Sequence, residues 1–132
     1  MQTYRGGGLP NVHRLFFTVG KRYRAPMYLA TSFDVGKAHE FAEGAQSRGE
    51  PPIVWTFKLD PVLKCNHANL IERKTLVQGE QEFLYAPYSV FEVVAVEWKA
   101  QSSWTAPHRV TLNVAPDNTE PADNDLPLAP WC

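Results

Sequence analysis

The sequence predicts one α+β domain in which short strands outnumber helices. Residues 53–59 and 90–96 are rich in β-branched and aromatic side chains, as strands are. Residues 35–47 instead place apolar side chains at helical spacing. Because the chain has 132 residues and 44% of them are hydrophobic, it can bury one core. We therefore expect a sheet with a helix packed on it.

The charge balance and the cysteines argue against several classes of protein. With 13 basic and 14 acidic side chains the net charge is −1, so no nucleic-acid or membrane partner is expected. No apolar run reaches the ~18 residues of a membrane span, and residues 1–10 lack a signal-peptide layout. A soluble protein is expected, either cytoplasmic or delivered as an effector. Cys65 and Cys132 are read as free thiols, and Cys65 with His67 offers too few ligands for a metal.

The first elements begin with glycines and basic residues. Arg5 followed by Gly6 suits binding of a phosphate, because a guanidinium can clamp pyrophosphate or ribose oxygens. Glycine lets backbone groups approach a planar carboxamide closely. Taken alone, this segment fits a flexible glycine loop better than a binding site. Residues 11–23 are predicted to form a loop leading to a short strand. Their basic residues could line an anionic cofactor, but keeping an edge strand soluble is the more common role.

The next segment predicts a strand followed directly by a helix. Residues 27–34 read as a strand that ends at Asp34, a favourable N-cap for the helix 35–47. Gly49 and the prolines after it end this helix. The apolar side chains expected on its sheet-facing side are Ala38, Phe41, Ala42 and Ala45.

The second half of the chain contains more strands and then changes composition. After the strand 53–59, residues 62–70 are predicted to be irregular. Closing strands are expected at 90–99 and 110–114. Residues 115–132 contain four prolines and four acidic side chains without any Lys or Arg, which is typical of a disordered or loosely docked tail. We therefore expect a domain over residues 1–114 and an acidic, proline-rich tail over 115–132.

The most informative stretch is residues 79–93. Glu80 and Glu82 are separated by one residue at the start of a strand, so their side chains point to the same face. Pro87 and Tyr88 then interrupt the strand with a turn. Considered alone, a Glu-x-Glu pair is more often two solvated carboxylates than a site.

This stretch resembles the E-x-E signature of the arginine-type mono-ADP-ribosyltransferases, the R-S-E class. Three motifs occur in the order of that family and at about its spacing: Tyr4-Arg5-Gly6, Ala30-Thr31-Ser32 and Glu80-Gln81-Glu82. The resemblance covers nearly all of residues 1–114. It implies two small, roughly perpendicular antiparallel sheets with few helices, NAD as a substrate in the cleft between them, and no metal.

The resemblance also implies a role for each matching residue. Glu82 would stabilise the positive charge that develops on the ribose, and Glu80 would bind the acceptor guanidinium and act as its base. The cofactor-binding residues implied are Arg5, Gly6, Thr31, Ser32 and Phe33, of which Arg5 holds phosphates, Gly6 the nicotinamide amide, and Phe33 covers the ring. The implied partners are NAD and an acceptor protein, with arginine as the modified side chain.

The sequence departs from the family pattern at Ala30, which stands where the family has the first motif serine. Either Thr31 or Ser32 supplies that hydrogen bond, or it is absent. An NAD glycohydrolase and a catalytically weak NAD-binding module are therefore alternatives to the transferase. A glycosidase has less support, because a pair on one strand does not provide the ~5 Å or larger separation of two flanking carboxyl groups.

Overall fold

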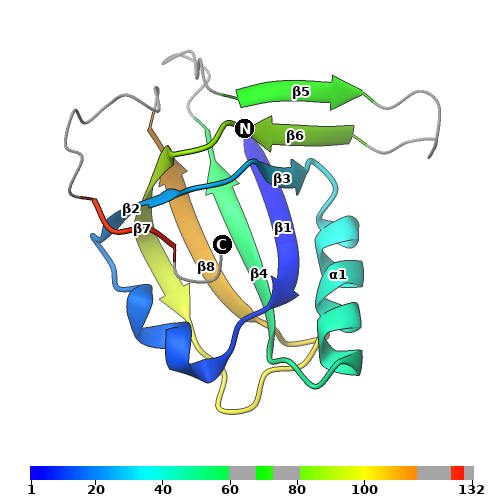
Figure 1. The fold of residues 1–132 in the computed structure, drawn as a ribbon. Coiled ribbons are helices and arrows are strands. Elements are labelled where there is room, and N and C mark those ends of the chain that lie inside the picture. Colours follow the sequence, from blue (N-terminus) through cyan, green and yellow to red (C-terminus); the bar gives the residue numbers. More distant parts are fainter. Residues whose placement is uncertain (60–67, 73–80, 116–125, 130–132) are drawn as a thin grey trace.

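A computed structural model describes residues 1–59, 68–72, 81–115 and 126–129. Its elements (Figure 1) are β1 (Gln2–Gly8), the 3₁₀ helix η1 (Asn11–Phe16), β2 (Arg22–Ala25), β3 (Leu29–Ser32), α1 (Val35–Ser47), β4 (Pro52–Lys58), β5 (Ala68–Glu72), β6 (Gln81–Tyr85), β7 (Ser89–Glu97) and β8 (His108–Val114). The predicted α+β class is confirmed. Within this described part of the chain, no helix has the length and apolar character needed to cross a membrane.

The strands form one curled sheet in two halves. Its order is β2-β7-β8-β4-β1-β3-β6-β5, and all neighbours are antiparallel except β4 and β8. The halves meet at β1 and β3, which share a single register pair, Tyr4 with Ser32. Strands β5 and β6 run across the direction of β1 and β4 (Figure 1). The two crossing sheets that the sequence suggested are thus joined at one residue pair.

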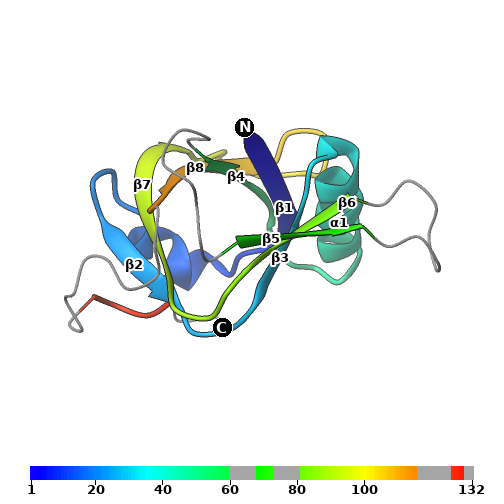
Figure 2. The same cartoon turned by 90° about the horizontal axis from the view of Figure 1, so that it is seen from above.

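The hydrophobic core fills the inside of the curl. Seen from above, the strands bend around a common centre (Figure 2). Phe57 of β4, Tyr85 of β6 and Phe91 of β7 are almost completely buried. Their ring centroids lie 5.2 to 5.5 Å apart, although these strands are not neighbours in the sheet. The curvature therefore lets distant strands share one aromatic cluster, which holds the sheet in this shape.

Helix α1 packs on the other face of β1 and β4. The predicted cap is confirmed, because the Asp34 carboxylate accepts a hydrogen bond of 2.8 Å from the backbone N–H of Gly36. Three alanines of the helix are buried against the sheet: Ala38, Ala42 and Ala45. The expectation that Phe41 joins them is wrong, since its side chain is 63% exposed. At 100° per residue it lies about 60° around the helix from Ala38, at the margin of the buried stripe.

Three segments differ from the sequence-based expectation or extend it. Residues 68–70 belong to β5 and are not irregular, and β5 pairs with β6 at the end of the described strand order. Part of the expected loop 11–23 forms η1. Within the expected tail, residues 126–129 lie along β2: the Arg24 N–H donates to the Pro127 carbonyl (3.0 Å), and the Ala129 N–H donates to the Arg24 carbonyl (2.9 Å).

Candidate functional site

A cavity of about 160 Å³ opens where the two halves of the sheet meet the N-terminal part of α1. Strands β1, β3 and β6 and helix α1 all contribute to its wall. The lining residues are Tyr4, Arg5, Gly6, Ala30, Thr31, Ser32, Lys37, Ala38, Phe41 and Glu82. The three sequence motifs, which are far apart in the chain, are therefore represented around one cavity.

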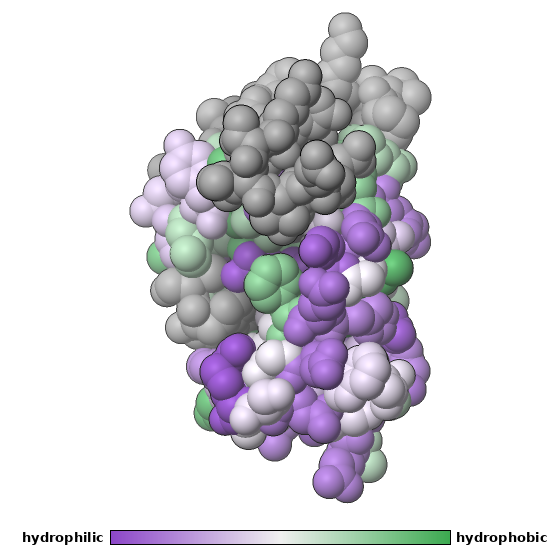
Figure 3. Space-filling model, turned by 90° about the vertical axis from the view of Figure 1, so that its right-hand side faces the viewer, coloured by the Kyte–Doolittle hydropathy of each residue, from purple (hydrophilic) through white to green (hydrophobic). Residues whose placement is uncertain are grey.

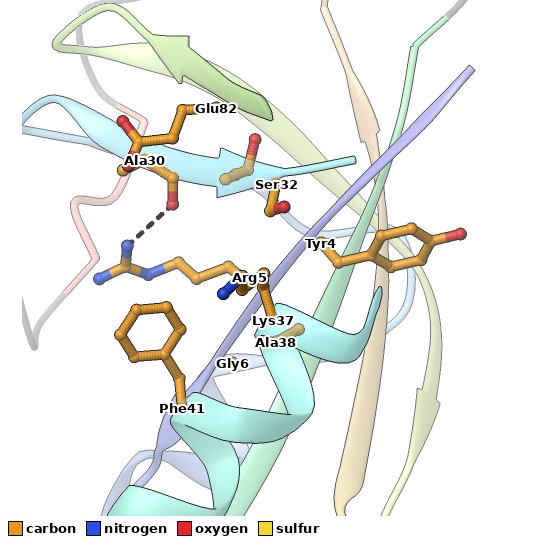
Figure 4. A pocket seen from close by; sticks show the side chains of 10 residues that line it. Tyr4, Arg5, Gly6, Ala30, Ser32, Lys37, Ala38, Phe41 and Glu82 are labelled. Atoms are coloured by element: carbon orange, nitrogen blue, oxygen red, sulfur yellow. Dashed lines mark hydrogen bonds between the residues drawn. The ribbon is translucent and has the colours of Figure 1, made fainter. Parts of the chain in front are cut away.

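The two charged residues expected to act on the dinucleotide line this cavity together. Arg5 comes from β1 and Glu82 from β6, and both side chains are partly buried. The Arg5 Nη1 donates a 3.0 Å hydrogen bond to the Ala30 carbonyl, which fixes the direction of the guanidinium. In Figure 4 both side chains extend toward the same end of the cavity, on either side of β3. A cation and a carboxylate are thus held at one opening.

The hydroxyl groups of the second motif have different surroundings. Thr31 is 4% exposed, and its Oγ1 donates a 2.7 Å hydrogen bond to the Phe83 carbonyl. Ser32 is the direct register partner of Glu82 between β3 and β6, so both side chains lie on one face of the sheet. The Ser32 Oγ accepts a 3.0 Å hydrogen bond from the Asp34 N–H. Of the two hydroxyls, that of Ser32 is therefore on the side of Glu82, whereas the Thr31 hydroxyl bonds the backbone of the sheet.

Gly6 lines the cavity and is also needed for the packing of α1 on β1. A Cβ at this position would overlap the backbone carbonyl oxygen of Ala38. The absence of a side chain therefore lets α1 lie directly on β1. This close contact brings the N-terminal part of the helix to the edge of the cavity beside Arg5.

Helix α1 supplies three lining residues that the sequence motifs do not name, Lys37, Ala38 and Phe41. Lys37 and Phe41 are one helical turn apart and both line the cavity. The Lys37 Nζ lies 3.5 Å from a carboxylate oxygen of Glu40. The rest of the face that α1 turns to solvent is predominantly hydrophilic (Figure 3). In the sequence, the signal for Phe41 is an aromatic side chain at the margin of an alanine stripe, where a ring too large for close packing on the sheet is left exposed.

Among the described residues that were predicted for the site, Phe33 does not line the cavity. Phe33 is partly buried next to the core, and its ring packs edge-on against Phe83 with centroids 5.5 Å apart. Glu80 lies outside the described residues, as do the loop 75–78 and the pair Cys65 and His67. No cluster of three or more His, Cys, Asp or Glu suitable for a metal occurs among the residues that the structure describes.

Comparison of the fold with solved structures gives consistent neighbours. The ADP-ribosyltransferase Vis of Vibrio splendidus, in complex with its inhibitor M6, superposes with a TM-score of 0.67 at 16% identity, covering 86% of this chain and 48% of Vis. HopU1 of Pseudomonas syringae gives a TM-score of 0.61 at 19% identity, covering 86% of this chain and 44% of HopU1.

Exoenzyme S of Pseudomonas aeruginosa, solved with human 14-3-3 protein and carba-NAD, gives a TM-score of 0.60 at 16% identity, covering 96% of this chain and 54% of the enzyme. The chain therefore spans about half the length of these neighbours. No family model and no curated protein matches the sequence. The agreement is one of three-dimensional structure: this chain has the fold of the mono-ADP-ribosyltransferases.

Proposed function

We propose that this protein is an NAD⁺-dependent mono-ADP-ribosyltransferase that transfers ADP-ribose to an arginine side chain of a protein and releases nicotinamide. The observation that carries the proposal is that Glu82 and Arg5 line one cavity, with Ser32 directly opposite Glu82. The fold supports it independently, since the structural neighbours are ADP-ribosyltransferases.

Glu82 is the proposed catalytic carboxylate. Breaking the bond between nicotinamide and ribose develops positive charge on the sugar, and a fixed carboxylate beside the ribose lowers the energy of that state. Pairing with β3 and β5 on both sides holds the β6 backbone at Glu82 in place. Ser32 is the proposed hydrogen-bond partner that holds the Glu82 carboxylate in place. In the family this role belongs to a serine at the position that is Ala30 here.

Arg5 is the proposed ligand of the dinucleotide phosphates. A guanidinium matches phosphate oxygens in a forked geometry, and the contact with the Ala30 carbonyl aims it at the cavity opening. The cavity of about 160 Å³ is smaller than the ~300–1,000 Å³ of sites for drug-sized ligands. It therefore suits the nicotinamide and its ribose, while the adenosine half extends outside.

We propose that the Phe41 ring, and not that of Phe33, stacks on the nicotinamide. Its ring is exposed at the cavity edge, next to the Arg5 guanidinium in Figure 4. A flat aromatic surface stacks well on a planar heterocycle. Lys37, one turn earlier in α1, adds a second cation on the same side for an anionic substrate.

The acceptor side of the reaction is assigned to Glu80. It precedes β6 by one residue, and a carboxylate there would bind an acceptor guanidinium and remove its proton. If water takes the place of the acceptor, the same site acts as an NAD glycohydrolase. Ala30, in place of the family's serine, favours the further alternative of a weakly catalytic NAD-binding module.

Incubation with labelled NAD and a mixed protein lysate separates these activities. Label on protein indicates transfer, free ADP-ribose alone indicates hydrolysis, and saturable NAD binding without either product indicates a binding module. Glu82→Gln should abolish both reactions, whereas Glu80→Gln should abolish transfer to arginine and spare hydrolysis.

Glu43→Gln is the matched control, because it neutralises an exposed carboxylate of α1 that does not line the cavity. It should retain the activity of the unmodified protein. Equal activity of Glu82→Gln and Glu43→Gln would refute the proposed role of Glu82.

A further inference from the structure

A second and larger cavity, a groove of about 570 Å³, lies at the other end of α1. It is bounded by η1, the C-terminal end of α1, the connection between β7 and β8, and the start of β8. Lys37 in the first turn of α1 and Phe41 at its middle line the first cavity, whereas Gln46 near the helix end lines this groove. Its walls share no residue with the candidate transferase site.

A buried histidine forms part of the wall of this groove. His108 is 2% exposed, and its Nδ1 accepts a 2.9 Å hydrogen bond from the Lys99 backbone N–H. Because an accepting nitrogen carries no proton, the neutral ring carries its proton on Nε2. The hydrogen bond to the Lys99 N–H uses Nδ1 and leaves Nε2 without a bond to another described residue. No buried side-chain nitrogen or oxygen in the described part of the chain lacks a partner, so this nitrogen reaches solvent at the groove wall. The Nε2–H is thus a donor at the wall of the groove.

Arg14 also lines the groove, and its positive charge acts on the His108 ring. Its guanidinium carbon lies 5.0 Å from the centroid of the Trp98 ring, which in turn packs edge-on against His108 at 5.2 Å. No ion pair joins Arg14 to a carboxylate in the described parts of the chain. The acidic side chain in the groove, Glu50, lies 3.4 Å from the Nε of Arg48.

Other groups in the groove are also donors. The Gln46 Oε1 accepts a 2.7 Å hydrogen bond from the Trp104 N–H, which leaves its amide NH₂ to donate. Burial lowers the pKa of His108, and the positive charge of Arg14 lowers it further. An anion bound in the groove would offset the positive charge of Arg14 and accept a hydrogen bond from the His108 Nε2–H.

We propose that this groove binds a small ligand through a phosphate or carboxylate group held between the Arg14 guanidinium and the His108 Nε2–H. Guanidinium and imidazole N–H groups together match the oxygens of such anions. The groove volume falls within the ~300–1,000 Å³ of small-molecule sites. Neither group belongs to the proposed NAD site, so this inference does not depend on the transferase activity.

The test is a nuclear magnetic resonance titration of the His108 ring and Trp98 indole signals. Inorganic phosphate and acetate are added in separate arms, and sodium chloride at matched ionic strength serves as a third. We expect saturable shifts in the phosphate or the acetate arm beyond those in chloride, and the tighter of the two identifies the group that is bound. Arg14→Gln should weaken binding at least about tenfold, as expected for loss of a charged hydrogen bond.

Lys21→Gln is the matched control. The Lys21 Nζ lies 3.7 Å from the centroid of the Phe16 ring and does not line the groove, so this change also removes one cation that stands over an aromatic ring. It should bind the anion as the unmodified protein does. The proposal is overturned if no arm exceeds chloride, if Arg14→Gln binds normally, or if both variants weaken binding equally.

Discussion

At the scale of single residues, Gly6 links the packing of the helix to the site. A side chain at this position would meet the Ala38 backbone, which cannot rotate away. We expect Gly6→Ala to lower the free energy of unfolding by about 1–3 kcal/mol, the usual cost of overpacking. Urea denaturation measures this. Gly7→Ala is the control, because its Cβ would meet only a ring carbon of Trp55 at 3.6 Å, an ordinary contact. Equal stability of the two variants would contradict the packing role.

Substitution of the two phenylalanines near the site should have different effects, one on NAD binding and the other on stability. Phe41 is 63% exposed, so Phe41→Ala should change the free energy of unfolding by less than about 0.5 kcal/mol. If its ring stacks on nicotinamide, the KM for NAD should rise roughly two- to tenfold. Phe33 packs on Phe83, so Phe33→Ala should mainly lower stability. The assignment fails if Phe33→Ala raises the KM and Phe41→Ala does not.

At the scale of elements, residues 126–129 behave as an additional edge of the sheet. Their backbone hydrogen bonds join β2 at Arg24, and Ala129 is 3% exposed within the core cluster. A chain ending at residue 125 should therefore lose about 1–3 kcal/mol of unfolding free energy, from two hydrogen bonds and buried apolar surface.

Thermal and urea denaturation of the shortened chain measure this loss. A chain ending at residue 130 retains the segment and is the control, which should be nearly as stable as the full chain. A shortened chain of unchanged stability would mean that the contacts along β2 contribute nothing to folding.

The elements that the sequence predicted well are those defined by local chemistry. Asp34 caps α1 because its side chain bonds a backbone N–H two residues away. The turn at Tyr88 is closed by the Ser89 N–H, which donates to the Ala86 carbonyl three residues earlier. Strand β5 was missed because it depends on pairing with β6, which only tertiary structure supplies. Phe41 was wrongly expected to be buried, because helical periodicity gives the direction of a side chain and not the distance between the helix and the sheet.

The candidate site was predictable in part, because its motifs are local in sequence whereas the pairing between their strands is not. The motifs named Arg5, Gly6, Thr31, Ser32 and Glu82, and the structure gathers these around one cavity. The sequence left open which hydroxyl replaces the one missing at Ala30. The register between β3 and β6 puts Ser32 opposite Glu82, and such a register cannot be read from one strand alone.

At the scale of the whole molecule, the buried His108 makes stability depend on pH. Burial and the positive charge of Arg14 hold its pKa below 6.5 in the folded state, while the unfolded chain takes up the proton near that value. The unfolded state therefore binds more protons just below pH 6.5, and the stability present above this pH is lost as the pH falls toward the folded pKa.

Urea denaturation at pH 7.5 and 5.5 tests this dependence. The unmodified protein should lose more stability between the two values than His108→Gln, whose side chain does not titrate. Equal losses would show that His108 has the same pKa in both states.

The central claim is that Glu82 faces the nicotinamide ribose while Arg5 holds the phosphates, across the joint between the two halves of the sheet. A crystal structure with a non-hydrolysable NAD analogue tests it most directly. We predict that the ribose carbon bonded to nicotinamide lies beside the Glu82 carboxylate, with the pyrophosphate at Arg5 and the nicotinamide ring against Phe41. An analogue bound elsewhere, or bound here with its ribose turned away from Glu82, would contradict the claim.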